Sequence, residues 1–209
     1  GTAAGLGLLS ARGMDDPTTA YYRQRAEAFY ADTMAVGMDP LYERFLPWIP
    51  AGGHILDAGC GSGRDTRAFI DRGYRVAAFD ASPELARLAS RHAGQEVLVM
   101  RFEDIDWQRT FDGIWACASL LHVPASRLPG VMARLAGALK PGGTLYASFK
   151  HGKGAREHKG RRFTDLDEAG LAALLAEVPG LSPIETWVTG DLRPGRAAEP
   201  WLNVLLRAD

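Results

Sequence analysis

The stretch Asp57-Ala58-Gly59-Cys60-Gly61-Ser62-Gly63 separates a short apolar segment from a segment with helical periodicity. The apolar segment, residues 54–57, has the length of a short buried strand. Residues 64–72 have the apolar spacing of a helix, and Gly73 follows them as a typical helix C-terminal residue. Glycines between a strand and a helix let the backbone approach a ligand closely. The stretch therefore predicts a strand–loop–helix unit with a ligand at the loop, and a tight turn that binds nothing is the alternative.

Strand-like and helix-like segments alternate after this unit. Such alternation is typical of an α/β domain with a mostly parallel, doubly wound sheet and helices on both faces. Two strand-like segments near the end of the chain predict a terminal hairpin, so one terminal strand is expected to be antiparallel. The seven expected strands cover residues 54–57, 74–79, 97–102, 111–117, 144–149, 184–189 and 201–206. The expected helices cover residues 18–36, 64–72, 128–139 and 164–178, and one more starts at Ser82-Pro83.

Residues 18–209 are expected to form a single domain, because no linker or repeat divides them. The start of the chain lacks the basic region of a secretion signal, so residues 1–17 are expected to be a flexible leader. Met14 is a candidate native start, which would leave residues 1–13 outside the native chain. The expected divisions of the domain are a helical cap over 18–50, a ligand-binding core over 53–150 and a basic loop over 151–163.

The charge balance excludes several classes of partner. The chain has 24 Lys and Arg against 25 Asp and Glu, a formal net charge of −1, so no overall positive field attracts nucleic acid or an anionic membrane. No apolar run approaches the ~18 residues that a membrane-spanning helix needs. Cys60 and Cys117 lack the spacing of a metal site and are expected to be reduced thiols. We therefore expect a cytoplasmic protein with a small-molecule partner and no metal, either monomer or homodimer.

The glycine spacing distinguishes between two kinds of ligand. A dinucleotide loop has the pattern G-x-G-x-x-G, whose third glycine would stand at Arg64, whereas this loop has G-x-G-x-G. Asp57 lies two positions before the first glycine, where its carboxylate can pair with an ammonium group. The pattern D-x-G-x-G-x-G after an Ile-Leu strand resembles motif I of the Rossmann-like class I S-adenosylmethionine-dependent methyltransferases. In loop style and size the chain is similar to small bacterial members near the tellurite-resistance and quinone-ring C-methyltransferase types.

Further segments resemble this family in the same order along the chain. Asp80, at the end of the second expected strand, is similar in place to the acid that binds both ribose hydroxyls, with a helix cap as the alternative. Phe102-Glu103-Asp104-Ile105 resembles the adenine-reading segment, and Asp104 is the first choice for the acid there, with a solvated acidic loop as the alternative. Residues 111–124 resemble motif IV with its following loop, and Lys140-Pro141-Gly142-Gly143 resembles the loop before the fifth strand.

The resemblance implies S-adenosylmethionine as the cofactor and S-adenosylhomocysteine as the product. It places the methionine end at the glycine loop, the ribose at Asp80 and the adenine at residues 103–105. The residues expected to contact the cofactor are Asp57, Gly59, Cys60, Gly61, Gly63, Arg64, Asp80, Ala81, Glu103, Asp104, Ile105 and Cys117.

Motif IV disfavours DNA as the methyl acceptor. It lacks the Asn/Asp-Pro-Pro-aromatic pattern of amino-directed DNA methyltransferases. Neither cysteine follows a proline, as the nucleophile of a cytosine-methylating enzyme would. Residues 150–162, KHGKGAREHKGRR, are strongly basic and directly follow the fifth strand. They are either an active-site flap that attracts an anionic acceptor or a solvated surface loop. We expect a small-molecule acceptor, with anionic character if the flap interpretation holds.

Two histidines are candidate general bases for an acceptor that arrives protonated. His122 lies in the loop after the fourth strand, where acceptors bind, although a packing role fits it equally well. His151 lies at the root of the basic segment. Tyr22 and Tyr30 share one face of the first helix, and they are either a lid over the ligand or part of the core. Lys150 completes the residues expected at the acceptor or its lid.

Two other functions remain open at this stage. A nicotinamide-dependent oxidoreductase uses a similar sheet, but the glycine spacing disfavours it. A non-catalytic protein that binds S-adenosylmethionine fits the same motifs, because methyl transfer depends mainly on orientation and requires no obligatory catalytic side chain.

Overall fold

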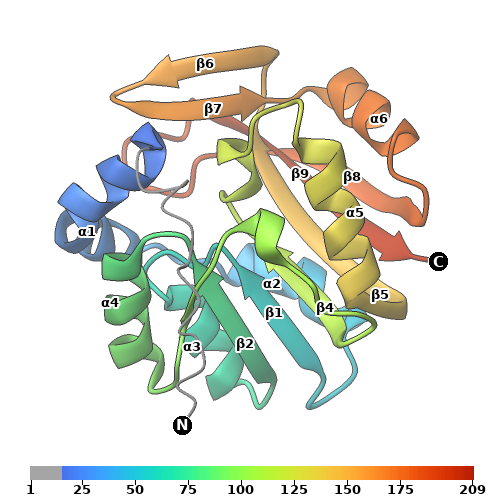
Figure 1. Ribbon diagram of the computed structural model, residues 1–209, viewed down its shortest axis with the longest axis horizontal. Coiled ribbons are helices and arrows are strands. Elements are labelled where there is room, and N and C mark those ends of the chain that lie inside the picture. The colour runs from blue at the N-terminus through green and yellow to red at the C-terminus, as the bar shows by residue number, and fades with distance from the viewer. Residues whose placement is uncertain (1–15) are drawn as a thin grey trace, which may run out of the picture.

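The computed structural model describes residues 16–209 and shows a seven-stranded sheet with helices on both faces (Figure 1). The strand order is β3-β2-β1-β4-β5-β9-β8. The strands are β1 (His54–Ala58), β2 (Arg75–Asp80), β3 (Leu98–Val99), β4 (Phe111–Ala116), β5 (Leu139–Lys150), β8 (Leu181–Gly190) and β9 (Pro200–Ala208). The helices are α1 (Pro17–Met34), α2 (Asp39–Phe45), α3 (Arg64–Asp71), α4 (Pro83–Ala93), α5 (Leu128–Ala138) and α6 (Glu168–Ala176), with three short 3-10 helices at Leu46–Trp48, Phe102–Asp104 and Leu120–His122.

The directions of the strands confirm the predicted fold class. Strands β1 to β5 pair in parallel, and β9 runs antiparallel between β5 and β8. The chain leaves β1 toward β2 on one side and returns to β4 on the other, so the strand order reverses beside β1. Loops that follow the carboxyl ends of strands diverge at such a point and leave a crevice. The fold therefore provides a ligand crevice between the loops after β1, β2 and β4.

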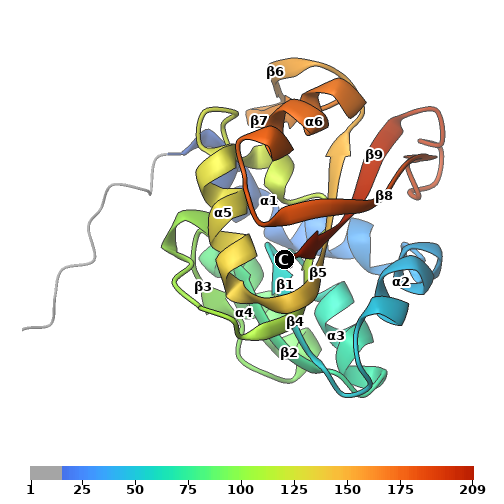
Figure 2. The same cartoon turned by 90° about the vertical axis from the view of Figure 1, so that its right-hand side faces the viewer.

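Alternating residues of the central strands pack on opposite faces of the sheet, as the twofold period of a strand requires. On β1, Ile55 packs with the core that includes α2 and α3, and Leu56 packs with the core that includes α5 and α6. Figure 2 shows α5 on one side of the sheet and α2 and α3 on the other. Trp115 of β4 stacks on Tyr146 of β5, with ring centroids 4.1 Å apart. Both faces of the sheet are therefore buried, which explains the continuous apolar runs of its strands.

The first helix packs on α4 through Ala26, Leu85 and Leu88, with Tyr22, Phe29 and Tyr30 beside them. It begins one residue earlier than expected, at Pro17 after Asp16. Residues 1–15 of the expected leader lie outside the described residues. The described part of the chain contains no helix with the length and apolar character needed to span a membrane.

Three local expectations were wrong. The basic segment is ordered as a hairpin of β6 (Gly154–His158) and β7 (Arg161–Asp165), because five residue pairs form a separate two-stranded ladder. The last helix begins after Asp167, whose side chain accepts a hydrogen bond from Gly170 N–H at 2.8 Å, rather than at Thr164. Residues 140–143 belong to the start of β5 instead of a separate loop.

Candidate active site

The glycine loop follows β1, and all three of its glycines have close neighbours. Gly59 and Gly61 both have positive φ angles, 74° and 55°. A Cβ atom would lie 2.6 Å from Ser119 Cβ at the first position and 3.0 Å from Phe29 Cε1 at the second. Gly63 also has positive φ, but a Cβ atom there would lie 2.9 Å from the Cα atom of Ala89. The first two glycines therefore shape the crevice, whereas Gly63 lets α3 pack against α4.

Two adjoining cavities open beside this loop, with volumes of about 490 Å³ and 760 Å³. The first lies toward the ends of β2 and β3, and the second lies toward β5, β9 and the β6–β7 hairpin. Their shared wall consists of Tyr22, Phe29, Gly59, Gly61, Ala118 and His122. A ligand that occupies the first cavity can therefore reach the second past the glycine loop.

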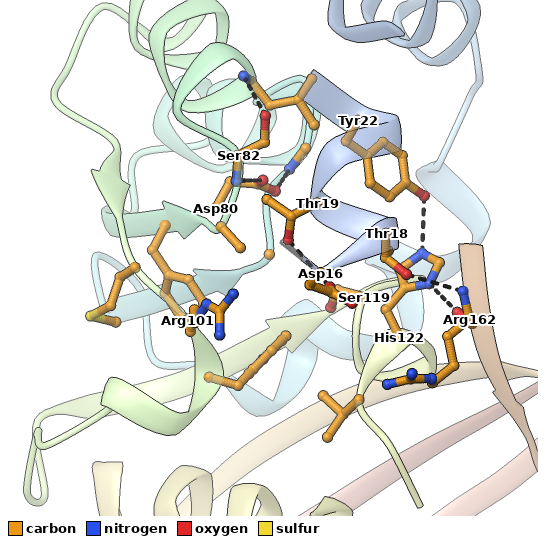
Figure 3. Close-up of a pocket in the computed structure, with 18 of the residues that line it drawn as sticks. Asp16, Thr18, Thr19, Tyr22, Asp80, Ser82, Arg101, Ser119, His122 and Arg162 are labelled. Carbon is orange, nitrogen blue, oxygen red and sulfur yellow. Dashed lines mark hydrogen bonds between the residues drawn. The ribbon is translucent and has the colours of Figure 1, made fainter. Parts of the chain in front are cut away.

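Asp80 ends β2 and lines the first cavity (Figure 3). Its Oδ2 accepts a hydrogen bond from Gly61 N–H at 2.9 Å, and its Oδ1 accepts one from Ser82 N–H at 2.9 Å. Burial raises the pKa of this carboxyl, while these backbone hydrogen bonds act in the opposite direction. A carboxylate has about four acceptor positions, so Asp80 keeps acceptor capacity beside its backbone donors Gly61, Ala81 and Ser82. Asp80 thus accepts hydrogen bonds from the backbone of the glycine loop and of the start of α4, and it can still bind a diol. The helix-cap role and the ligand-binding role are therefore compatible.

The far end of the first cavity contains Glu103 but not Asp104. Phe102 and Glu103 line the cavity together with Met100. Asp104 is exposed, and its Oδ2 accepts a hydrogen bond from Arg101 N–H at 3.2 Å, which closes the short 3-10 turn. Ile105 is 1% exposed in the main core. Of the three residues expected around the adenine, only Glu103 therefore reaches the cavity, whereas Ala81 lines it as expected.

Asp57 lines the second cavity and is 2% exposed. Its Oδ2 accepts a hydrogen bond from Thr66 Oγ1 at 2.6 Å. Burial and the negative charge of Asp65 raise the pKa of Asp57 to about 8. The carboxyl is therefore mostly protonated at neutral pH, and an arriving cation would favour its ionised form.

Asp65, which sequence reasoning missed, anchors the wall beside Asp57. Arg64 donates to both of its carboxylate oxygens, at 2.7 and 3.0 Å, and Tyr42 and Trp115 donate to them at 2.5 and 2.8 Å. Burial opposes its ionisation, but these donors hold the pKa of Asp65 below its usual range. The predicted ligand residue Arg64 lines the second cavity with its guanidinium committed to this carboxylate. No sequence signal marks Asp65, because its partners come from α2 and β4.

His122 connects the two cavities with the first helix. Its Nδ1 lies 2.8 Å from the carbonyl oxygen of Arg162, which can only accept, so Nδ1 carries the hydrogen. Its Nε2 lies 2.9 Å from the hydroxyl of Tyr22, which therefore donates to it (Figure 3). Burial lowers the pKa of His122 to about 4. The imidazole is neutral at pH 7, and Nε2 is the nitrogen that can accept a proton.

The comparisons with known proteins agree with this geometry. Residues 55–143, from β1 into β5, match the family model described as a methyltransferase domain. Over this range, less than half of its length, the chain is similar to the methyltransferase domain family. It is 37% identical over 106 residues to the ubiquinone biosynthesis O-methyltransferase of Xanthomonas axonopodis pv. citri (strain 306), an alignment that covers 47% of this chain and 44% of that protein. The chain thus matches less than half the length of this curated relative.

Solved structures show the same fold over nearly the whole chain. The 1,6-didemethyltoxoflavin-N1-methyltransferase of Burkholderia thailandensis, solved with bound 1,6-didemethyltoxoflavin and S-adenosylhomocysteine, has a TM-score of 0.75 and 23% identity. That alignment covers 99% of this chain and 93% of the other. The N-methyltransferase NodS of Bradyrhizobium japonicum WM9, in complex with S-adenosylhomocysteine, has a TM-score of 0.68 and 16% identity over 93% of this chain and 99% of the other. At these identities the likeness concerns the fold.

The fold brings some of the expected acceptor residues together and separates others. Tyr22 and Lys150 line the second cavity, and Cys60 and Cys117 lie in the same wall. Tyr30 lines neither cavity and contacts His92 of α4 edge to face, at 5.9 Å between ring centroids. His151 also lines neither, and its Nε2 lies 3.1 Å from Glu168 Oε2. The core interpretation therefore fits Tyr30, and the His151 side chain contacts Glu168 instead of either cavity.

Ala118 marks the junction of the two cavities although nothing in the sequence singles it out. It follows β4 with φ of 51°, a backbone conformation that is costly for a residue with a Cβ atom. Its N–H donates to Ser148 Oγ at 2.8 Å, which holds the turn. Strained backbone of this kind is common at binding and catalytic sites of folded proteins.

Among residues 16–209, no group of three or more His, Cys, Asp or Glu side chains is placed to hold a metal ion.

Proposed function

We propose that this chain binds S-adenosylmethionine across the two cavities and transfers its methyl group to a small acceptor in the second. The observation that carries this proposal is the adjoining pair of cavities that meet at Gly59, Gly61 and His122. One cavity suits an adenosine and the other suits an acceptor, and the glycine loop between them allows the close approach that a reacting methyl group needs.

The residues present fit the cofactor. Asp80 keeps acceptor capacity for the ribose hydroxyls. Glu103 can accept a hydrogen bond from the adenine amine, and Met100 and Phe102 offer apolar surface to the ring. Asp57 can pair with the ammonium group of the methionine end, which removes the cost of its burial. Glu103 takes the role that was expected of Asp104.

The chain's own residues provide orientation and a path for a proton. When bound, S-adenosylmethionine supplies an electrophilic methyl group and a thioether leaving group. The acceptor hydroxyl donates to the oxygen of Tyr22, whose own hydrogen points to His122 Nε2. As the new oxygen–carbon bond forms, the acceptor proton passes to Tyr22 and the tyrosine proton passes to His122. The carbonyl oxygen of Arg162 stabilises the resulting imidazolium through Nδ1–H.

The acceptor is proposed to be a small molecule with anionic character. Lys150, Arg156, Arg161 and Arg193 all line the second cavity. Three of them pair with carboxylates, whereas Arg161 has no ion pair within residues 16–209 and is the cation that supports an anionic acceptor. The cytoplasmic location, the absence of a nucleic-acid partner and the monomeric or homodimeric state remain predictions from composition.

The experiment that tests the cofactor is calorimetric titration with S-adenosylhomocysteine. Wild type is expected to bind it, and Asp80→Ala is expected to lose tenfold or more in affinity, since charge-assisted hydrogen bonds contribute about 1.5–3 kcal/mol. NAD serves as the comparison ligand, and binding of NAD instead would favour the oxidoreductase. Binding of S-adenosylhomocysteine without turnover on any member of a broad acceptor panel would favour a non-catalytic binder.

A further inference from the structure

Three of the six Lys and Arg side chains of the basic segment are neutralised by ion pairs within the protein. Arg156 pairs with Asp165 on the facing strand of the hairpin. Lys153 pairs with Asp167 at 3.2 Å, and Lys150 pairs with Asp191 at 3.3 Å and with Glu199 at 2.6 Å. These paired groups offer little net charge to a ligand, so the number of basic residues alone overstates the positive field of the second cavity.

Arg161 differs from these cations. Its guanidinium carbon lies 4.5 Å from the ring centroid of Tyr21, 5.1 Å from that of Phe163 and 5.9 Å from that of Tyr22. Within residues 16–209 no Asp or Glu oxygen lies within 4.0 Å of it, and its one hydrogen bond is a long donation to Tyr22 Oη at 3.5 Å. Its Nε atom is buried without a hydrogen-bond partner. A guanidinium held in place by aromatic rings with donors left over is suited to bind an anion.

The position of Arg161 relative to His122 limits the shape of that anion. Both side chains contact the same atom, the hydroxyl oxygen of Tyr22, at 3.5 Å and 2.9 Å. Arg161 and the Tyr22–His122 pair can therefore form hydrogen bonds to two oxygens that lie close together on one small ligand. The walls around them include Phe29, Leu121 and Phe163, which favour a flat apolar body.

We propose that Arg161 binds the carboxylate of an aromatic hydroxy acid whose hydroxyl, on the adjacent ring carbon, lies against Tyr22 and His122. The guanidinium donates from its planar edge to the carboxylate oxygens, and the aromatic rings around it fix its orientation. The identity of the hydroxyl as the methyl acceptor rests on the proposed function, whereas carboxylate binding by Arg161 does not need the cofactor.

The test is calorimetric titration of the full chain with 2-hydroxybenzoate, alone and in the presence of saturating S-adenosylhomocysteine. We expect 2-hydroxybenzoate to bind at least tenfold more tightly than phenol, which lacks the carboxylate. It should also bind more tightly than 4-hydroxybenzoate, whose hydroxyl cannot reach Tyr22 while the carboxylate is held. Benzoate should bind with an intermediate affinity, because it retains the carboxylate alone.

Arg161→Gln should lower the affinity for 2-hydroxybenzoate at least tenfold, and Arg161→Lys should restore part of it. Lys153→Gln is the matched control, because it removes the same charge just before β6 from a side chain that is 83% exposed and lines neither cavity. Affinity for S-adenosylhomocysteine and the unfolding midpoint should change little in all three variants. If Arg161→Gln does not fold, the affinity of Arg161→Lys for 2-hydroxybenzoate is compared with that of wild type, and a lower affinity is expected.

Equal binding of phenol and 2-hydroxybenzoate, or an equal loss in Lys153→Gln and Arg161→Gln, would overturn the proposal. So would the absence of carboxylate binding in a chain that binds S-adenosylhomocysteine. If S-adenosylhomocysteine does not bind but 2-hydroxybenzoate binds in an Arg161-dependent way, the proposed function fails and the anion site stands.

Discussion

The hydroxyl of Tyr22 lies 2.9 Å from Nε2 of His122 and joins the first helix to the loop after β4, across 100 positions of sequence. The same imidazole is held from its other side by the carbonyl oxygen of Arg162 on β7. Three segments that are distant in sequence thus meet at one ring, at the boundary of the two cavities. This contact turns a tyrosine from a helix face into a candidate proton relay.

Replacement of Tyr22 by Phe should therefore lower kcat while leaving cofactor binding intact. The ring still packs on Phe29, at 5.0 Å between ring centroids, but the relay to His122 is lost. We expect kcat to fall roughly 100-fold, the lower range for general acid–base catalysis. His122→Gln should have a similar effect, and the double variant should lose no more than either single one. Independent, multiplicative losses in the double variant would show that the two residues do not act as a pair.

Glu103 and Asp104 provide a direct test of adenine recognition by two adjacent acids. Glu103→Gln should weaken S-adenosylhomocysteine binding several-fold, since a charged acceptor in the first cavity becomes a neutral amide with one acceptor oxygen. Asp104→Asn is the matched control, because Asp104 is exposed and lines neither cavity. Calorimetry of both variants measures the difference. A larger effect at Asp104 would restore the assignment expected from sequence.

Cofactor binding should depend on pH through Asp57. Its pKa of about 8 exceeds the ordinary aspartate value of 3.8. Without ligand the folded state therefore keeps a proton that the unfolded chain loses, and stability falls as pH rises from about 4 to 8. Pairing with an ammonium group favours the ionised form, so binding at pH 7 should release close to one proton. The affinity for S-adenosylhomocysteine should consequently rise up to tenfold per pH unit between about pH 5.5 and 7.

Titrations in buffers of different ionisation enthalpy measure this proton release. Asp57→Asn removes the titrating group and should abolish the release, so an unchanged release in that variant would assign the proton to another residue.

Gly63→Ala should destabilise the chain more than Gly73→Ala. Both glycines have positive φ, 77° and 86°, so both substitutions incur a backbone cost of about 1–2 kcal/mol. A Cβ atom at Gly63 also meets Ala89 Cα at 2.9 Å, whereas nothing lies within 4 Å at Gly73. This overpacking adds about 1–3 kcal/mol. Urea unfolding measures the free energy of unfolding of the two variants. Equal losses of stability would mean that α3 and α4 can move apart to accommodate the methyl group at Gly63.

The local pattern of the sequence was sufficient for the sheet and for part of the site. Strand–glycine loop–helix order, alternating segments and the acid at the end of β2 depend on near neighbours in sequence, and they predicted the seven strands and the placement of Asp80. The N-cap of α6 was misplaced because Thr164 and Asp167 carry the same local signal. The pairing of β7 with β6 decides between them, because it places Thr164 in a strand and leaves Asp167 as the N-cap.

Contacts between distant segments decided the rest. Glu103 faces the cavity because the carboxylate of Asp104 bonds to its own turn, and His151 is removed from the crevice by Glu168. Tyr22 reaches His122, and Arg161 lies among aromatic rings, only because β7 docks against α1. Periodicity and motif spacing record which face of an element is buried, so they determine the fold. Which polar group each side chain meets depends on elements brought together in space, and only the tertiary structure supplies those partners.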